Sequence, residues 1–155
     1  MAASRWSIAA GALLLLAGQA PAQDARVTIV TILASAAHQE INPKLRQIAA
    51  EVQKHEPSLT GFRIHSVESK DLNLGQKESF QLMKDVSADV TVLAQDKTKN
   101  RIQLAVKPPQ MGEVTFAIAY DKYLPIVTRQ LAANDRLILA IMAQPPKAAA
   151  DATAK

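Results

Sequence analysis

The feature that most constrains the fold is a series of short segments in which apolar and polar residues alternate. The clearest is Val86–Val92, where Val and Ala alternate with Ser, Asp and Thr. Arg101–Lys107 repeats this pattern after a polar stretch at Asp96–Asn100. Successive side chains of a strand point to opposite faces, so a period of two predicts half-buried strands. The two segments therefore predict a β-hairpin.

Two other segments are apolar almost throughout and rich in β-branched residues. Arg26–Ala34 reads RVTIVTILA and Arg136–Ala143 reads RLILAIMA. A continuous apolar run of this length predicts a strand that is buried on both faces. We therefore expect the first and last strands to lie side by side at the centre of a sheet.

One segment between them has the pattern of a helix. Asn42 is suited to cap a helix and Pro43 to occupy its first position. Apolar residues follow at helical spacing across Leu45–Val52. Pro57 disfavours helical geometry at Glu56, so the predicted helix ends there.

Irregularities and turns divide the segment after Leu59 into further strands. Alternation begins at Phe62 and is interrupted at Val67, which predicts a β-bulge near Ser66. Gly75 predicts a turn before another short strand around Phe80.

A second hairpin is predicted near the C-terminus. Val114–Tyr120 and Tyr123–Thr128 would pair around a tight turn at Asp121 and Lys122. Pro125 lacks a backbone N–H, which indicates an edge strand. A connection at Leu131–Asp135 would then lead into the last strand.

This order of elements predicts an α+β fold. One N-terminal helix would pack on a mainly antiparallel β-sheet of six to eight strands. The alternative is a β-sandwich with an incidental helix.

The first 22 residues have the pattern of a secretory signal peptide. Arg5 supplies a positive charge, Ile8–Gly18 a short apolar core, and Ala20-Pro21-Ala22 the small residues of a cleavage site. The predicted organisation is a signal peptide at 1–22, a single domain at 23–146 and a disordered Ala/Lys tail at 147–155. The apolar run is too short to span a bilayer, which favours a cleaved leader over a membrane anchor. We therefore expect an exported protein, periplasmic or extracellular, with no stable membrane insertion after the leader is cleaved.

The composition excludes several classes of function. The chain has no cysteine, which rules out disulfides, thiol catalysis and zinc–thiolate sites. Without the leader, 17 basic and 14 acidic residues remain, and the basic residues are spread along the chain, so no nucleic-acid partner is expected. Glycine-rich phosphate loops are absent, and no cofactor is predicted.

Few residues are candidates for chemistry. His38, Glu40 and His65 could form a metal site in a small hydrolase if the first connection folded over the strand, although no recognised metal-binding spacing is present. We therefore identify no catalytic, cofactor-binding or metal-binding residue, and an enzyme is the less favoured interpretation.

Two groups of residues are candidates for surface contact. Lys97, Lys99 and Arg101 form the one local concentration of positive charge, at the predicted hairpin tip. Tyr120 and Tyr123 flank the second predicted turn, and Tyr is enriched at protein interfaces.

These observations favour a small exported, non-enzymatic domain that binds a partner protein or a cell-envelope component. An exposed sheet edge that accepts a partner strand is one route to such binding. The alternatives are a carrier of a small apolar ligand held between helix and sheet, and the metal-dependent hydrolase. The sequence does not indicate which edge is open or what the oligomeric state is.

Overall fold

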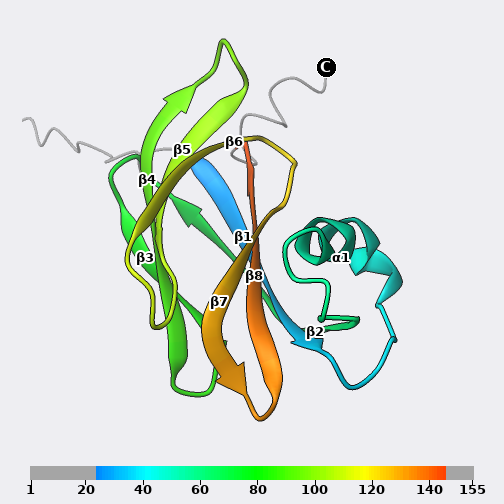
Figure 1. Cartoon of the computed structure of the whole chain (residues 1–155). Coiled ribbons are helices and arrows are strands. Elements are labelled where there is room, and N and C mark those ends of the chain that lie inside the picture. Colours follow the sequence, from blue (N-terminus) through cyan, green and yellow to red (C-terminus); the bar gives the residue numbers. More distant parts are fainter. Residues whose placement is uncertain (1–23, 146–155) are drawn as a thin grey trace, which may run out of the picture.

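Eight strands form two four-stranded sheets that face each other, with one short helix outside them (Figure 1). This arrangement is seen in the computed structural model, which describes residues 24–145. The strands are β1 (Ala25–Ser35), β2 (Gly61–Leu72), β3 (Lys77–Met83), β4 (Val86–Asp96), β5 (Arg101–Lys107), β6 (Val114–Ala119), β7 (Leu124–Ala132) and β8 (Asp135–Gln144). Between β1 and β2 lie a short 3₁₀ helix, η1 (Pro43–Leu45), and α1 (Arg46–Gln53).

The two sheets contain different parts of the chain. Sheet A has the strand order β2-β1-β8-β7, and sheet B has the order β3-β4-β5-β6. All paired neighbouring strands are antiparallel. Each sheet therefore has two edge strands, β2 and β7 in sheet A and β3 and β6 in sheet B.

The main core lies between the sheets. Alternate residues of β4 and β5 point inward, which is why the two strands show such regular alternation in the sequence. They meet the inner rows of β1 and β8 in a single buried cluster that includes Phe80, Val90, Leu104, Leu137 and Leu139.

A second, smaller core lies between sheet A and the helix. The outward row of β1, with Val30 and Ile32, packs with Ile48 and Val52 of α1. β8 likewise turns one row of side chains to the sandwich core and another, including Ile138, to the helix. Both strands are therefore buried on both faces, as their continuous apolar runs predicted.

The predicted α+β fold with an N-terminal helix is wrong. The chain is a β-sandwich whose helix follows the first strand, which is the arrangement held as the alternative. After β2, the turn at Gly75 takes the chain into a second sheet instead of extending the first. An alternating strand has the same sequence pattern in either case, so the pattern could not distinguish one large sheet from two smaller ones.

The predicted hairpin at Val114–Thr128 is also wrong. β6 pairs only with β5, and β7 pairs with β8. Between them the chain crosses from one sheet to the other: the Tyr120 N–H donates to the carbonyl of Asn100, the residue before β5 of sheet B, and the Asp121 N–H donates to the Ala143 carbonyl in sheet A. The predicted connection at Leu131–Asp135 is in fact the end of β7, a turn and the start of β8.

Several local predictions are confirmed. β1 and β8 are neighbours at the centre of sheet A, and β4 and β5 form the predicted hairpin. His65 is the extra residue of a bulge in β2, next to Ser66. Gly75 has a φ of 81° in the turn before β3, and Pro125 lies on an edge strand. The Asn42 side chain caps η1 by accepting from the Lys44 N–H at 3.0 Å.

The predicted signal peptide at 1–22 and the predicted disordered tail at 147–155 lie outside the described residues. Within residues 24–145, no helix has the length and apolar character needed to cross a bilayer.

Candidate functional site

The four edge strands are the natural places to look for a partner-binding site. An edge strand presents unpaired N–H and C=O groups that can pair with another strand. Folded proteins protect such edges by covering them or by placing proline, charge or bulges there. The four edges of this sandwich differ in how far they are protected.

The β2 edge is covered where the strand begins. The connection after β1 lies along it, with Ile41 in a parallel bridge to Phe62. The Phe62 N–H donates to the Glu40 carbonyl at 2.9 Å, and the Phe62 carbonyl accepts from the Asn42 N–H at 3.0 Å. The bulge at His65 then distorts the strand further along. From Ser66 to Leu72 the pairing with β1 is regular, but there the side chains of Ser66, Glu68 and Lys70 bond to the backbone of β3. The β2 edge is therefore covered at its start and lies against β3 beyond the bulge.

The β3 edge is closed by side chains from β2. The Ser66 hydroxyl donates to the Leu82 carbonyl at 3.0 Å, and the Lys70 ammonium group donates to the Ser79 carbonyl at 2.6 Å. The Gln81 N–H donates to a carboxylate oxygen of Glu68 at 2.8 Å. These three bonds join the edges of the two sheets on this side of the sandwich.

The β7 edge is irregular. Pro125 removes one backbone donor, and the register with β8 breaks between Val127 and Leu131. At the break, the buried Thr128 hydroxyl donates to the Leu137 carbonyl at 2.7 Å and accepts from the Gln130 N–H at 3.1 Å. Both features disfavour the addition of a strand.

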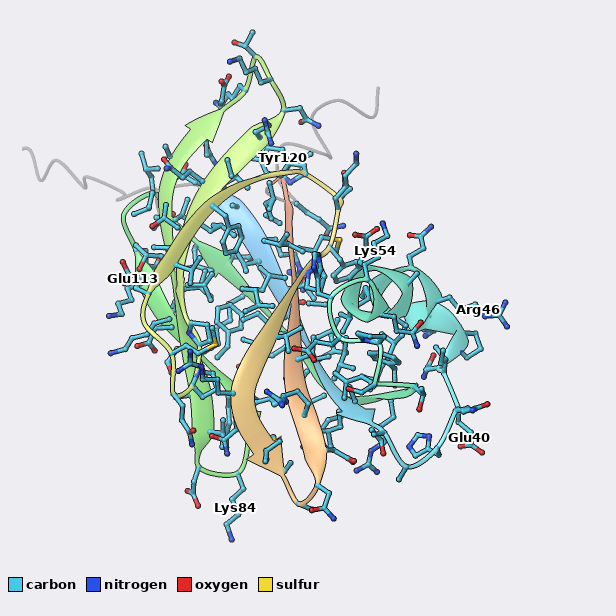
Figure 2. The ribbon with its side chains drawn as sticks, in the orientation of Figure 1. Glu40, Arg46, Lys54, Lys84, Glu113 and Tyr120 are labelled. Atoms are coloured by element: carbon cyan, nitrogen blue, oxygen red, sulfur yellow. The ribbon has the colours of Figure 1, made fainter. Side chains whose placement is uncertain are left out.

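The β6 edge has none of these protections. Its sequence, VTFAIA, contains no proline and no charged residue, and its pairing with β5 is regular from end to end. Figure 2 labels Glu113 just before the strand and Tyr120 just after it. Among the described residues, no side chain bonds to the backbone of Val114–Ala119.

The orientation of the free groups follows from the pairing. The Tyr120 N–H points to β5, since it donates to Asn100. Backbone groups alternate in direction along a strand. The N–H and C=O groups of Thr115, Ala117 and Ala119 therefore point away from β5, at the open edge. We take this row as the candidate site and call it the β6 edge.

The predicted cationic contact residues lie close to the β6 edge. Lys97 and Lys99 are exposed in the tip of the β4–β5 hairpin, and Arg101 begins β5 opposite Ala119. The hairpin tip extends past the end of β6 (Figure 1). None of these three cations takes part in an ion pair among the described residues.

The two predicted tyrosines are separated by the crossing between sheets. Tyr120 is buried in the main core, and Tyr123 is 41% exposed beside α1. Burial raises the pKa of Tyr120 above the ordinary value of 10.0, and the negative charge of Asp24 raises it further. Tyr120 therefore supports the core at the end of β6, and only Tyr123 is available at the surface.

The three candidate metal ligands do not converge. His38 and Glu40 lie in the connection over β2, where the Glu40 N–H donates to His38 Nδ1 at 3.3 Å. His65 is exposed further along β2 and does not line the same depression. No group of three or more His, Asp or Glu side chains in residues 24–145 is placed to hold a metal ion.

The space predicted for a small apolar ligand is filled by side chains. Leu45, Ile48 and Val52 pack directly on sheet A. A depression of about 550 Å³ lies at the surface between α1 and Tyr123. Four charged residues are among those that line it, Lys44, Glu51, Asp121 and Lys122. Pockets for apolar ligands are lined mainly by apolar side chains, so this depression does not favour a carrier.

Comparison with models of protein families, with curated proteins and with solved structures finds no match to this chain. The absence of charge and proline in Val114–Ala119 was visible in the sequence. It could not single out this strand because the edge strands themselves were unknown.

Proposed function

We propose that this chain is an exported, non-enzymatic binding domain that adds a strand of a partner protein to β6. The observation that carries the proposal is the contrast among the edges. Three described edges are covered or irregular, whereas the β6 edge is regular, uncharged and open. An open, regular edge promotes aggregation because it can pair with unintended strands. Its presence in a folded protein is therefore best explained by a binding role.

The side chains around the β6 edge suit such an addition. Thr115 and Ala117 are exposed and small, so a neighbouring strand can approach without obstruction. On the other face Phe116 is half-buried and Ile118 is buried at the margin of the core. An added strand would cover this apolar margin while its backbone pairs with the free groups, which is how strand addition combines affinity with selectivity.

A position-specific crosslinking experiment tests the proposal. A photo-crosslinking amino acid is placed at Ala117 in the exporting cell, with Ser79 as the matched control. Both positions are exposed on edge strands of sheet B, but the β3 edge at Ser79 is bonded to Lys70. We expect one recurring partner peptide from position 117 and none from position 79.

A backbone variant makes the test specific for strand pairing. Thr115→Pro removes one outward N–H, whereas Thr115→Val keeps it and preserves a β-branched side chain. Both variants should fold, because proline is tolerated on an edge strand where its N–H would face solvent. The crosslink at position 117 should be lost with Thr115→Pro and kept with Thr115→Val.

Three outcomes would overturn the proposal. Equal crosslinking at positions 79 and 117 would mean that the contact is unspecific. A crosslink that survives Thr115→Pro would mean that backbone pairing is not involved. A crosslinked peptide from this same chain would identify a second copy, not a partner protein, as the occupant.

A further inference from the structure

The C-terminal end of β6 lies beside a concentration of positive charge. Arg101 is the register neighbour of Ala119, and the Asn100 carbonyl accepts from the Tyr120 N–H. This places the hairpin tip, with the exposed Lys97 and Lys99, next to that end of the strand. Exposed cations with no described ion partner are free to meet acidic groups of a bound molecule.

Three acidic residues also lie at this end, Asp96, Asp121 and Asp24, whose charge acts on Tyr120. Asp96 accepts the Lys99 backbone N–H at 3.1 Å, and Asp121 accepts from the Gln144 side chain at 3.2 Å. Lys122 adds a further exposed cation beyond Tyr120. Four cations therefore face three acidic residues at this end of the β6 edge, which leaves a small excess of positive charge.

The opposite end of β6 is electrically different. Glu113 comes just before the strand, and Lys107 comes just after Val106, the register neighbour of Val114. Asp89 and Arg129 line the same depression as Lys107, so acidic and basic residues balance at this end. The strand between the two ends carries no charge. The charges that flank β6 are therefore distributed unevenly: the end beside the hairpin tip is positive, and the opposite end is balanced.

We infer that the β6 edge selects a strand whose N-terminal flank is acidic, an inference that rests on the proposed strand addition. All strands of sheet B are antiparallel, and antiparallel pairing is slightly the more stable kind. The N-terminus of an added antiparallel strand lies beside the C-terminal end of β6. Acidic residues there meet Lys97, Lys99 and Arg101, and the strand that follows alternates apolar with small polar residues.

Synthetic peptides test the inference on the full chain. Three capped peptides are compared: the neutral (Thr-Val)₃, Glu-Glu-(Thr-Val)₃ and (Thr-Val)₃-Glu-Glu. Binding of each labelled peptide is measured by fluorescence anisotropy at low salt. We expect the peptide with N-terminal glutamates to bind roughly two- to tenfold more tightly than the other two, as two exposed ion pairs would give.

Charge variants assign the preference to the hairpin tip. K97E/K99E should abolish the advantage of the acidic peptide and leave binding of (Thr-Val)₃ unchanged. The matched control is R46E/K84E, which reverses two exposed cations that form no ion pair among the described residues, one at the start of α1 and one in the turn between β3 and β4. Figure 2 shows both of them away from Tyr120 at the end of β6. The control should keep the advantage, and high salt should reduce it in the unaltered chain.

The outcomes distinguish failure of strand addition at β6 from failure of the selection for an acidic flank. If no peptide binds, or if binding persists with Thr115→Pro, strand addition at β6 is wrong. If all three peptides bind equally, strand addition stands and the selection for an acidic flank is wrong. Tighter binding of the peptide with C-terminal glutamates would overturn the antiparallel arrangement.

Discussion

Gly61 is the residue at which the start of β2 depends on the lack of a side chain. A Cβ atom there would overlap the His38 ring and lie 2.9 Å from the His38 carbonyl oxygen. The Thr60 hydroxyl donates to that same carbonyl at 2.7 Å, which holds the connection against the strand. Glycine thus allows the segment that covers the β2 edge to approach closely.

We expect Gly61→Ala to lower the free energy of unfolding by about 1–3 kcal/mol, the usual cost of overpacking. Urea unfolding measures this difference. His38→Ala in the same chain should recover part of the loss, because the exposed ring can be removed but the carbonyl oxygen stays. Equal stability of Gly61→Ala and the unaltered chain would contradict the close approach.

Tyr120 illustrates how a residue can serve the candidate site without contacting a partner. Its ring is buried in the main core, and its backbone N–H joins the end of β6 to the hairpin tip. Burial and the charge of Asp24 disfavour its ionised form, so its pKa is raised in the folded state.

The raised pKa of Tyr120 makes stability depend on alkaline pH. Between the ordinary pKa of 10.0 and the higher folded value, the folded state holds a proton that the unfolded state has lost. Stability therefore falls as the pH rises above about 10. We expect Asp24→Asn to lower the pKa of Tyr120 only in part, since burial is the larger cause.

Titration of tyrosinate absorbance in a Tyr123→Phe background reports on Tyr120 alone, because the chain has two tyrosines. Asp24→Asn in the same background completes the comparison. An unchanged pKa in Asp24→Asn would rule out the influence of that carboxylate.

At the scale of elements, the edge strands differ in how their outward N–H and C=O groups are protected from pairing with another strand. β2 and β3 are joined by side-chain bonds from Ser66, Glu68 and Lys70. β7 is interrupted by Pro125 and a break in register. β6 has regular pairing on one side and is open on the other.

Hydrogen exchange should alternate along β6. The N–H groups of Val114, Phe116 and Ile118 point to β5 and should exchange slowly. Those of Thr115, Ala117 and Ala119 point outward and should exchange fast in the free protein. Exchange measured residue by residue by NMR checks this pattern. Slow exchange at all six positions would show that the edge is already paired in the free protein.

At the scale of the whole molecule, two cores share the strands β1 and β8. The main core joins the two sheets, and the second attaches η1 and α1 to the outer face of sheet A. Only the main core includes residues of both sheets. We therefore expect the helix to detach without unfolding the sandwich.

A matched pair of substitutions separates the two cores. Leu104 is fully buried in the main core, and Leu45 is 2% exposed in the second. Leu104→Ala should lower the free energy of unfolding by about 2–5 kcal/mol and weaken amide protection in both sheets. Leu45→Ala should expose the amides of α1 to exchange and leave those of sheet B protected. Loss of protection in sheet B with Leu45→Ala would show that the cores unfold as one.

The sequence identified some residues of the candidate site but not their arrangement. The cations at the hairpin tip were identified because Lys97, Lys99 and Arg101 are close together in the sequence. Their position beside the end of β6 depends on the pairing of β5 with β6. The two tyrosines were predicted to pair across a hairpin, but the chain changes sheets between them. Tyr120 is therefore buried in the main core, and Tyr123 lies at the surface beside α1.

The sequence by itself determined the position of most strands, the bulge near Ser66, the start of the helix at Asn42 and the burial of β1 and β8 on both faces. These features depend on local periodicity, capping and backbone restriction, which a short segment carries with it. Only the tertiary structure decided that the strands divide into two sheets, that β6 and β7 do not pair, and that the β6 edge is open. The physical reason is that an alternating strand buries one face equally well in one large sheet or in a sandwich, and the choice lies in contacts between segments distant in the chain.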